Sequence, residues 1–422
     1  MKVMQTEYKD TKIGKIPKDW EVIKLGETCE FYRGQPFAKS EIDNNGDHEC
    51  IHYGELFTVY SEIIRKIYSK TNSEVVRASK FGDVLMPSSD VTPIGLATAS
   101  VINKNGVLIG GDVNIIRPIL KLNSDYLSYL INHEKKKIIR LISGTNVKHI
   151  YNRNIKTLLY ALPPLPEQQK IAEILSTVDG QISTTQAIIE KSKELKKGLM
   201  QKLFSEGIGH TEFKDTKIGR IPKDWEVVKV GDICKLQGGF AFKSADASES
   251  GVRWFKIANV GINRVKWNDE SFLPNGFEEK HSDFVLNEGD IVVAMTRPVL
   301  SGQLKICRIL KNDSGSLLNQ RVGRVVLKDN DDSIYFYQCF NTKHFIDSVE
   351  GELFGTDPPN ISSKIFENIK ILLPPKQERG KIADILIEAD AKIEKEEQEK
   401  AQLEQLKKGL MQQLLTGQKR VA

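Results

Sequence analysis

The chain has 422 residues, 40% of them hydrophobic and 28% charged, with a formal net charge of +5 at pH 7. This length allows two or three domains that each bury a core, and the composition excludes disordered and fibrous classes. The mild positive charge permits a nucleic-acid partner without requiring one.

The cysteines and the hydropathy of the chain bear on its compartment. Five cysteines are scattered along it without a CxxC pair, which argues against zinc sites and disulfide frameworks and favours a reducing environment. No stretch resembles a signal peptide or a membrane-spanning run. We therefore expect a soluble, cytoplasmic protein with no membrane partner.

An opening segment occurs twice in the chain. Residues 8–27 return as residues 213–232, with 15 of the 20 positions identical. In each copy a proline fixes a turn, and the tryptophan three residues later, Trp20 or Trp225, is expected to anchor that turn on the core. The predicted strands that follow span residues 21–24 and 226–229. This internal repeat predicts two similar domains.

Between the repeated segments, short alternating runs are separated by glycine, asparagine and aspartate. They predict a compact, mostly antiparallel sheet in each half. The predicted strands span residues 83–86, 94–101, 107–109 and 112–116, and residues 290–295, 302–309 and 321–327. Helical stretches at residues 124–142 and 333–349 make each globule α+β. Glycine-threonine turns at 144–150 and 355–361 then lead to last strands at 155–162 and 366–373.

A Leu-Pro-Pro phrase opens a long charged segment in each half, with an offset of 211 residues from Leu162 to Leu373. These segments predict two helices of about 38 residues, or roughly 57 Å each. Their apolar residues recur with the four-three spacing of a coiled-coil seam. The candidate seam and subunit-docking residues are Ile171, Leu175, Val178, Ile182, Ile189, Ile382, Leu386, Ile393, Leu403 and Leu410.

The simplest arrangement packs these two helices antiparallel, as a rod with a globule at each end. Gly207 and Gly209 are expected to end the first helix. Gly198 and Gly409 occupy equivalent positions in a repeated Lys-Lys-Gly-Leu-Met-Gln phrase. Because glycine costs about 1 kcal/mol relative to alanine within a helix, we attribute both to a close approach by the other helix or a globule.

Motifs for catalysis are weak throughout the sequence. Residues 357–360, Asp-Pro-Pro-Asn, resemble the loop of amino-methyltransferases, but asparagine replaces the aromatic residue and no glycine-rich cofactor loop lies upstream. A turn is the preferred interpretation. The seven histidines have no metal-ligand spacing. We therefore predict no catalytic site, no metal and no cofactor.

Basic and amide side chains on predicted turns are candidates for DNA contacts. Arginine and lysine suit phosphates and guanine edges, and asparagine and glutamine suit adenine. The candidates are Arg33, Lys39, Lys148, His149, Asn152 and Arg153 in the first globule, and Lys243, Arg253, Asn259, Arg297, Asn319, Gln320, Arg321 and Lys364 in the second. Each alone fits ordinary surface polarity, and only the set in both halves favours DNA.

The ordered combination of motifs, present in duplicate, resembles the specificity subunit of type I restriction–modification enzymes. It comprises the Ile-Pro-Lys-Asp-Trp opening, the Gly-Thr turn, the Leu-Pro-Pro entry and the Leu-Lys-Lys-Gly-Leu-Met-Gln helix end. The resemblance implies a target-recognition domain at 1–162, a helical spacer at 163–208, a second target-recognition domain at 209–373 and a second spacer at 374–422.

The resemblance implies a non-catalytic subunit that recognises a split, asymmetric sequence in double-stranded DNA. It also implies docking of two methyltransferase subunits and recruitment of restriction subunits, to which S-adenosylmethionine and ATP would belong. One departure, at residues 376–380 compared with 165–169, puts the second helix entry in doubt. The alternatives are a protein-only adaptor, whose binding need not depend strongly on salt, and an enzyme in its own right.

Overall fold

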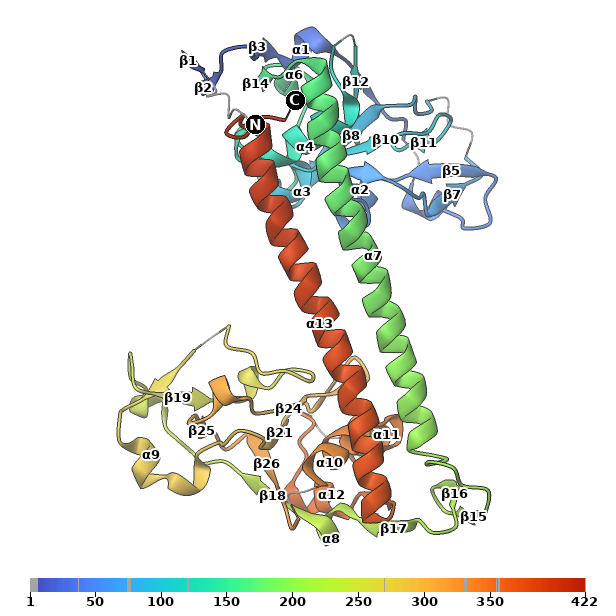
Figure 1. Ribbon diagram of the computed structural model, residues 1–422, viewed down its shortest axis with the longest axis vertical. Coiled ribbons are helices and arrows are strands. Elements are labelled where there is room, and N and C mark those ends of the chain that lie inside the picture. The colour runs from blue at the N-terminus through green and yellow to red at the C-terminus, as the bar shows by residue number, and fades with distance from the viewer. Residues whose placement is uncertain are drawn as a thin grey trace, which may run out of the picture. The chain divides into compact units, whose positions relative to one another are not determined.

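The computed structural model describes residues 7–36, 38–73, 77–119, 121–268, 270–329, 332–353, 355 and 357–421. The chain forms two compact units. Unit 1 comprises Met1–Ala187 with Glu397–Ala422, and unit 2 comprises Ile188–Glu396. Each unit therefore contains one end of each long helix (Figure 1). Thr356, in the predicted second Gly-Thr turn, lies outside the described residues.

Unit 1 is built around a five-stranded sheet in the order β4-β12-β8-β10-β6. Neighbouring strands are antiparallel except β10 and β6, which are parallel. These strands are β4 (Cys29–Arg33), β6 (Ile63–Ile64), β8 (Asp83–Pro87), β10 (Ser100–Ile102) and β12 (Val113–Pro118). A three-stranded sheet contains β5 (His48–Ile51), β7 (Ser69–Thr71) and β11 (Leu108–Ile109).

Three two-stranded pairs and several helices complete unit 1. The pairs are β1 (Tyr8–Thr11) with β2 (Gly14–Pro17), β3 (Glu21–Lys24) with β14 (Leu159–Leu162), and β9 (Ser89–Asp90) with β13 (Lys148–His149). The shorter helices are α1 (Leu25–Thr28), η1 (Lys39–Glu41), α2 (Glu55–Thr58), α3 (Pro93–Leu96), α4 (Ser124–His133), α5 (Lys135–Ile139) and α6 (Asn152–Ile155).

Unit 2 repeats this plan with a four-stranded antiparallel sheet in the order β18-β26-β21-β24. These strands are β18 (Cys234–Gly238), β21 (Ile291–Ala294), β24 (Ile306–Arg308) and β26 (Val322–Leu327). Its three-stranded sheet contains β19 (Val252–Phe255), β20 (Phe272–Leu273) and β25 (Leu317–Leu318). The pairs are β15 (Phe213–Thr216) with β16 (Gly219–Pro222), β17 (Glu226–Lys229) with β27 (Lys370–Leu373), and β22 (Val299–Leu300) with β23 (Gln303–Leu304).

The shorter helices of unit 2 lie between these strands. They are α8 (Val230–Ile233), η2 (Ser244–Asp246), η3 (Ile257–Asn259), α9 (Phe277–Lys280), η4 (Ser282–Phe284), η5 (Lys311–Asp313), α10 (Ser333–Phe340), α11 (Lys343–Leu353) and α12 (Ser363–Asn368). The prediction of two similar α+β globules accompanied by two long helices is confirmed.

Some predicted elements are wrong in detail. Residues 94–101 do not form one strand, because Thr92 caps a short helix, α3, by accepting a hydrogen bond from the amide of Gly95 at 3.4 Å. The stretch at 124–142 is two helices, since Glu134 ends α4 with φ −84° and ψ 21°. The last strands begin later than predicted, because the helices α6 and α12 precede β14 and β27.

The repeated tryptophans are anchors, as predicted, and each is also tied to the start of a long helix. Trp20 and Trp225 are fully buried in the hydrophobic cores of their units. The indole N–H of Trp20 donates to Glu167 at 2.9 Å, and that of Trp225 donates to Glu378 at 2.9 Å. The opening motif and the helix-entry motif of each half therefore form one contact.

The second helix entry keeps its contacts despite its different sequence. Gln168, fully buried, donates to the carbonyl of Pro163 at 2.8 Å and accepts from the amide of Asn123, the N-cap of α4, at 2.9 Å. In unit 2, Arg379 donates to the carbonyl of Pro374 at 2.7 Å and to Asp332, the N-cap of α10, at 2.6 Å. The arginine replaces the glutamine by pairing with an acidic N-cap.

The long helices are α7 (Leu165–Leu203, 39 residues) and α13 (Lys376–Leu415, 40 residues), as predicted. Gly207, with φ +66°, and Gly209, with φ +74°, follow α7 in left-handed conformations that favour glycine. The predicted seam residues are all buried or half-buried, whereas most of their helical neighbours are exposed. They therefore lie on the face of each helix that packs within this chain, as a seam requires, and their role in subunit docking stays a prediction.

Within each unit the two long helices run antiparallel and are joined by equivalent ion pairs. In unit 1, Lys407 of α13 lies 2.7 Å from Asp179 of α7. Arg420, which follows α13, also lies 2.7 Å from Glu167 of α7. In unit 2, Lys196 lies 2.5 Å from Asp390. Burial alone would lower the pKa of Lys407, but the charges of Glu62 and Asp179 outweigh it and raise that pKa.

Gly198 and Gly409 do not mark a close approach, contrary to our prediction. A Cβ atom built on either would meet nothing within 4 Å outside its own helix. Both glycines are exposed, and Leu195 and Leu406, three residues before them, are 61% and 50% exposed. The packing of this chain therefore does not account for the two helical glycines.

None of the helices formed by the described residues is both long and apolar enough to span a lipid bilayer.

Candidate nucleic-acid interface

Four segments that are far apart in the sequence of unit 1 meet at one edge of its main sheet. The amide of Ser88 donates to the carbonyl of Asp112 at 2.8 Å, and the amide of Ile150 donates to the carbonyl of Ser88 at 3.0 Å. Arg33 donates through Nε to the carbonyl of Gly111 at 2.9 Å. We call this place the strand-end junction of unit 1, formed by residues 33–35, 88–90, 110–112 and 148–150.

Unit 2 contains the same junction. The amide of Met295 donates to the carbonyl of Arg321 at 3.0 Å, and the amide of Ile361 donates to the carbonyl of Met295 at 2.8 Å. The strand-end junction of unit 2 is formed by residues 238–240, 295–297, 319–321 and 359–361. The backbone frame is therefore shared by the two units, while the side chains it presents differ.

Glycine is required where two segments of each junction cross. A Cβ atom on Gly34 would lie 1.9 Å from the carbonyl oxygen of Gly110, and one on Gly239 would lie 2.4 Å from that of Asn319. No side chain fits at such distances. These two glycines hold the strand ends close together, and they explain why both halves of the sequence carry glycine at this point.

In unit 1 the junction contains or adjoins several predicted DNA-contact residues, but some of their polar atoms are already bonded within the protein. Arg33 also lies 3.1 Å from Asp112, and Lys148 donates to the carbonyls of Gly144 at 2.8 Å and Thr145 at 2.6 Å. Asn152 donates to the carbonyl of Tyr32 at 2.9 Å. These side chains position the loops of the junction.

An exposed stack lies beside them. The rings of His149 and Tyr151 are stacked with centroids 6.0 Å apart, and the guanidinium of Arg153 lies 4.9 Å above the Tyr151 ring. Tyr151, which is 38% exposed, was not predicted from the sequence. Aromatic rings and arginine planes offer flat surfaces that suit bases and sugars.

The segment after β9, which comprises a short loop and the start of α3, carries two apolar side chains into solvent. Val91 is 70% exposed and Ile94 is 67% exposed. The loop is braced by Asp90, which accepts from the Val91 amide at 2.7 Å and from the Thr92 hydroxyl at 2.6 Å. A rigid apolar tip beside the junction fits contact with thymine methyl groups or a base step.

In unit 2 the junction gathers four predicted residues of a different kind. Arg297, Gln320 and Arg321 are exposed, and Asn319 is half-exposed. Phe240, which is 38% exposed and was not predicted, contributes its backbone to the same place by accepting from the Gln320 amide at 2.9 Å. The second junction is therefore richer in arginine and amide groups than the first.

Other predicted residues lie away from the junctions or are unavailable. Asn259 is buried, and its side chain is used within its own turn, accepting from the Lys256 amide at 2.7 Å and donating to the Lys266 carbonyl at 2.8 Å. Lys39, Lys243 and Lys364 are exposed on short helices or their caps.

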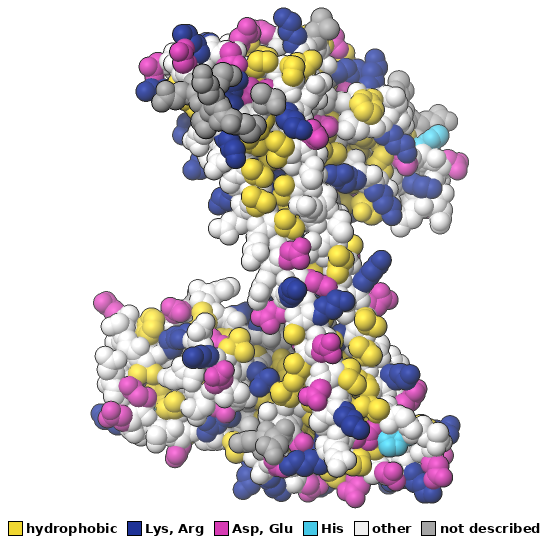
Figure 2. All heavy atoms as spheres, in the orientation of Figure 1, with side chains coloured by type: hydrophobic (Ala, Val, Ile, Leu, Met, Phe, Trp, Pro, Cys, Tyr) yellow, Lys and Arg dark blue, Asp and Glu magenta, His cyan; other side chains and the backbone are white. Residues whose placement is uncertain are grey.

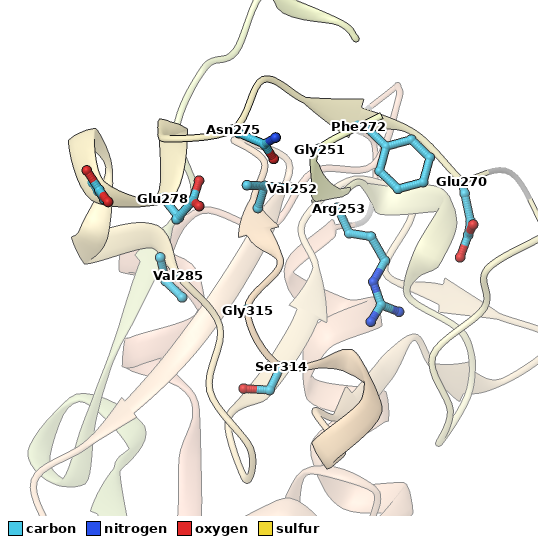
Figure 3. A pocket seen from close by; sticks show the side chains of 11 residues that line it. Gly251, Val252, Arg253, Glu270, Phe272, Asn275, Glu278, Val285, Ser314 and Gly315 are labelled. Carbon is cyan, nitrogen blue, oxygen red and sulfur yellow. The ribbon is translucent and has the colours of Figure 1, made fainter. Parts of the chain in front are cut away.

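Arg253 reaches from β19 beside a pocket of about 690 Å³ (Figure 3). Its guanidinium lies 4.8 Å above the ring of Trp267. Glu270, Glu278 and Glu279 also line this pocket, so its charge does not suit a phosphate.

The surface charges agree with the modest net charge of the chain. Basic and acidic side chains are interspersed on both units in the view of Figure 2. No group of three or more potential metal ligands occurs among the residues that the structure describes.

Comparison with known proteins places the repeated architecture in a family. The family model for the type I restriction modification DNA specificity domain matches residues 17–194 and 222–405. The chain belongs to this family. Its members are the specificity subunits of type I restriction enzymes, which are non-catalytic. The chain is accordingly a DNA-sequence recognition subunit that acts with DNA, methyltransferase and restriction partners.

Individual relatives match this chain along nearly its whole length. The chain is 33% identical over 422 residues to the type I restriction enzyme MjaVIII specificity subunit of Methanocaldococcus jannaschii, covering 99% of this chain and 97% of that protein. It is 30% identical to the putative MjaX specificity subunit of the same organism, with the same coverage. The crystal structure of a type I S subunit from M. genitalium matches with a TM-score of 0.62 and 16% identity over 98% of this chain and 99% of that one, which shows the fold.

Proposed function

We propose that this specificity subunit reads a bipartite, asymmetric DNA target, with one half-site contacted by each strand-end junction. The observation that carries the proposal is the shared backbone frame with different side chains. In unit 1 the Ser88 carbonyl accepts from Ile150, and in unit 2 the Met295 carbonyl accepts from Ile361. Equal frames place side chains equivalently on DNA, and unequal side chains select unequal sequences.

The two junctions present different side chains and therefore suit different half-site sequences. The first offers the His149, Tyr151 and Arg153 stack and the apolar tip at Val91 and Ile94, which suit thymine methyl groups and base steps. The second offers arginine and amide groups at 297 and 319–321, which suit guanine and adenine edges. The divided domain plan predicted above, with readers at 1–162 and 209–373, is part of this proposal.

We propose that the exposed faces of α7 and α13 dock two methyltransferase subunits. Leu195 with Gly198, and Leu406 with Gly409, form the same exposed surface once on each helix. Two equal surfaces suit two equal partners. An exposed glycine that destabilises its helix but lacks a neighbour in this chain fits a close approach by a partner's backbone. The methyltransferase and restriction subunits would carry S-adenosylmethionine and ATP.

The proposal is tested by moving one reader into a related specificity subunit. Residues 34–142 contain the junction segments 88–90 and 110–112, two residues of the segment 33–35, and the apolar tip at Val91 and Ile94. Their transfer should therefore change one half-site of the methylated sequence and leave the other unchanged. Methylome sequencing of a host with and without the chimera provides the measurement. A transfer that altered both half-sites, or neither, would refute the assignment of one reader to each unit.

The alternative of a protein-only adaptor predicts a different response to salt. Contacts with phosphates release counterions, so DNA affinity falls steeply as salt rises. A measured affinity for duplex DNA that is negligible at low salt in the assembled complex would favour the adaptor.

A further inference from the structure

A groove of about 670 Å³ opens in unit 2 beside the strand-end junction. Three cationic residues from separate segments line it, namely Lys266, Arg297 and Lys305. Its apolar lining includes Val260, Val299 and Leu353, and Glu350 supplies its one carboxylate. Cations therefore outnumber carboxylates by three to one around an apolar surface.

The three cations have no counterion in the described part of the chain. None takes part in a salt bridge or a side-chain hydrogen bond there, in contrast to Arg324 on the neighbouring strand β26, which donates to Gln237 at 2.7 Å and lies 3.4 Å from Asp290. Cations on one protein surface that lack acidic partners repel one another, and that repulsion is relieved when an anion lies between them.

Backbone contacts of unit 2 fix the positions of these cations. The amide of Lys305 donates to the carbonyl of Pro298 at 2.7 Å, and its carbonyl accepts from Ala294 at 2.9 Å. Burial, and after it the charge of Lys266, lowers the pKa of Lys305. The side chain of Lys266 crosses Gly261, where a Cβ atom would lie 3.0 Å from Cε of the lysine. Lys305 therefore has a backbone position held by two hydrogen bonds, and the Lys266 side chain lies against Gly261.

Arg297 connects the groove to the junction. Its amide donates to the carbonyl of Pro359 at 2.7 Å, and its φ of +47° places it in the left-handed region. An arginine gains nothing from that conformation, which asparagine and glycine adopt more readily. A strained backbone retained at an exposed cation is typical of a position kept for binding.

We infer that the groove formed by Lys266, Arg297 and Lys305 binds backbone phosphates of the DNA beside the second half-site. The inference rests on the proposed function and deepens it, because it assigns the phosphate contacts of one reader. Cations at the rim suit phosphates, while Val299 and the 54% exposed Leu300 suit the sugar edge of the strand. Such contacts set the register of the reader and carry no sequence preference of their own.

At the corresponding place, the unit 1 junction carries an acidic side chain instead of a basic one. There Asp90, at the end of β9, follows the main strand β8, and its carboxylate accepts from the Val91 amide and the Thr92 hydroxyl. In unit 2 the loop that follows Met295 carries Arg297 instead. The phosphate-binding groove is therefore a property of the second reader, and its loss should leave the first half-site unaffected.

The test uses the full chain assembled with the methyltransferase subunits of its own system, and a fluorescent 40-base-pair duplex of random sequence. Affinity is measured by anisotropy between 50 and 200 mM salt. Removing one lysine or arginine from a phosphate should reduce the slope of log affinity against log salt by about 0.9, which is roughly a 3.5-fold difference across this range. Arg297→Asn should reduce the slope by about that amount, and Lys266→Gln with Arg297→Asn and Lys305→Gln by up to about three times as much.

Arg297→Asn separates binding from folding, because asparagine tolerates a positive φ better than arginine does. Its melting temperature should equal or exceed that of the parent chain while its DNA affinity falls. The matched control replaces Lys214, Lys217 and Lys311, which are exposed and do not line the groove, with glutamine. This control removes the same charge and should retain nearly all of the slope.

The outcomes are distinct. If the parent complex shows no salt-dependent DNA binding, the proposed function itself fails. If the parent binds DNA and the groove variants bind it with the parent's slope, the groove is not a phosphate site. The inference also fails if the control triple variant loses as much slope as the groove variant. It is likewise overturned if the groove variants lose methyltransferase assembly instead of DNA affinity, since the groove would then bind a protein.

Discussion

Replacing Arg420 with alanine should destabilise unit 1 more than its place near the end of the chain suggests. Arg420 donates to both oxygens of Asp19, at 2.8 and 2.6 Å, and to both oxygens of Glu167, at 2.7 and 2.8 Å. The same Glu167 accepts from Trp20 at 2.9 Å. The arginine therefore links the last residues of the chain to the opening motif and to the start of α7.

The magnitude follows from the exposure of the two partners. The Asp19 side chain is 53% exposed, so its pair with Arg420 contributes about 0–1 kcal/mol. The Glu167 side chain is only 6% exposed, and removing the partner of a buried charge costs about 3–5 kcal/mol. Arg420 is itself 28% exposed, so solvent screening reduces the second figure. We expect a total loss of about 3 kcal/mol in the free energy of unfolding of unit 1.

The assay has to report on unit 1 alone, because a chain with two units need not unfold in one step. Hydrogen exchange at the first turns of α7 and around Trp20, measured across a urea series, provides that readout. Asp19→Asn is the matched control and should cost no more than about 1 kcal/mol. Glu167→Gln combined with Arg420→Ala should recover part of the loss, since the glutamine is neutral and still accepts from Trp20.

The reasoning would be refuted by two results. If Arg420→Ala lowers stability by no more than Asp19→Asn does, then Glu167 is not held by Arg420 in solution. If Arg420→Ala is costly but adding Glu167→Gln recovers nothing, the loss comes from packing of the C-terminal residues rather than from an unpaired buried carboxylate.

Three further predictions concern the long helices. Gly198→Ala and Gly409→Ala should each stabilise the free chain by about 1 kcal/mol in denaturant titrations while weakening assembly with methyltransferase subunits in sedimentation experiments; unchanged assembly would contradict the docking proposal. Lys407→Met should cost about 3 kcal/mol, because it leaves the buried Asp179 and the half-buried Glu62 without a cationic partner, although Tyr129 still donates to Asp179 at 2.5 Å. The pKa of Lys407 in the folded chain is raised above its usual 10.5. The stability difference between the parent chain and Lys407→Met should therefore be complete below pH 10.5 and shrink as the pH rises through the folded-state pKa, which unfolding curves at pH 8 and 11 would test. Insertion of one heptad into both helices should lengthen the gap between the two methylated half-sites, and an unchanged gap in a methylation assay would exclude the helices as its determinant.

Local sequence patterns determined the repeat, the two long helices and several strands of the main sheets, among them β8, β12, β21 and β26. The apolar spacing from Ile171 to Ile189 predicted which face of α7 is buried, because helical periodicity alone decides it. The alternation around residues 83–86 predicted β8 for the same reason. Errors arose where a local cap intervened, as at Thr92. The distance that the helices set between half-sites stays a prediction.

The candidate interface depended on tertiary structure, and only part of it could be predicted. Arg297, Asn319, Gln320 and Arg321 were chosen as polar turn residues, and the fold gathers them at one junction with Met295. The same reasoning chose Asn259, which strand packing buries. It overlooked Tyr151 and Phe240 because an exposed aromatic residue has the same sequence signature as a buried one.

The sequence by itself determined that this protein has two related α+β globules with long helices, and the repeated motifs identified its family. Only the tertiary structure showed that Gly198 and Gly409 face open space, and that Lys266, Arg297 and Lys305 line one groove. The physical reason is the distance along the sequence over which each effect acts. Periodicity and capping act between residues a few positions apart, whereas a binding surface is assembled by strand pairing between segments tens of residues apart, and their proximity leaves no trace in either segment alone.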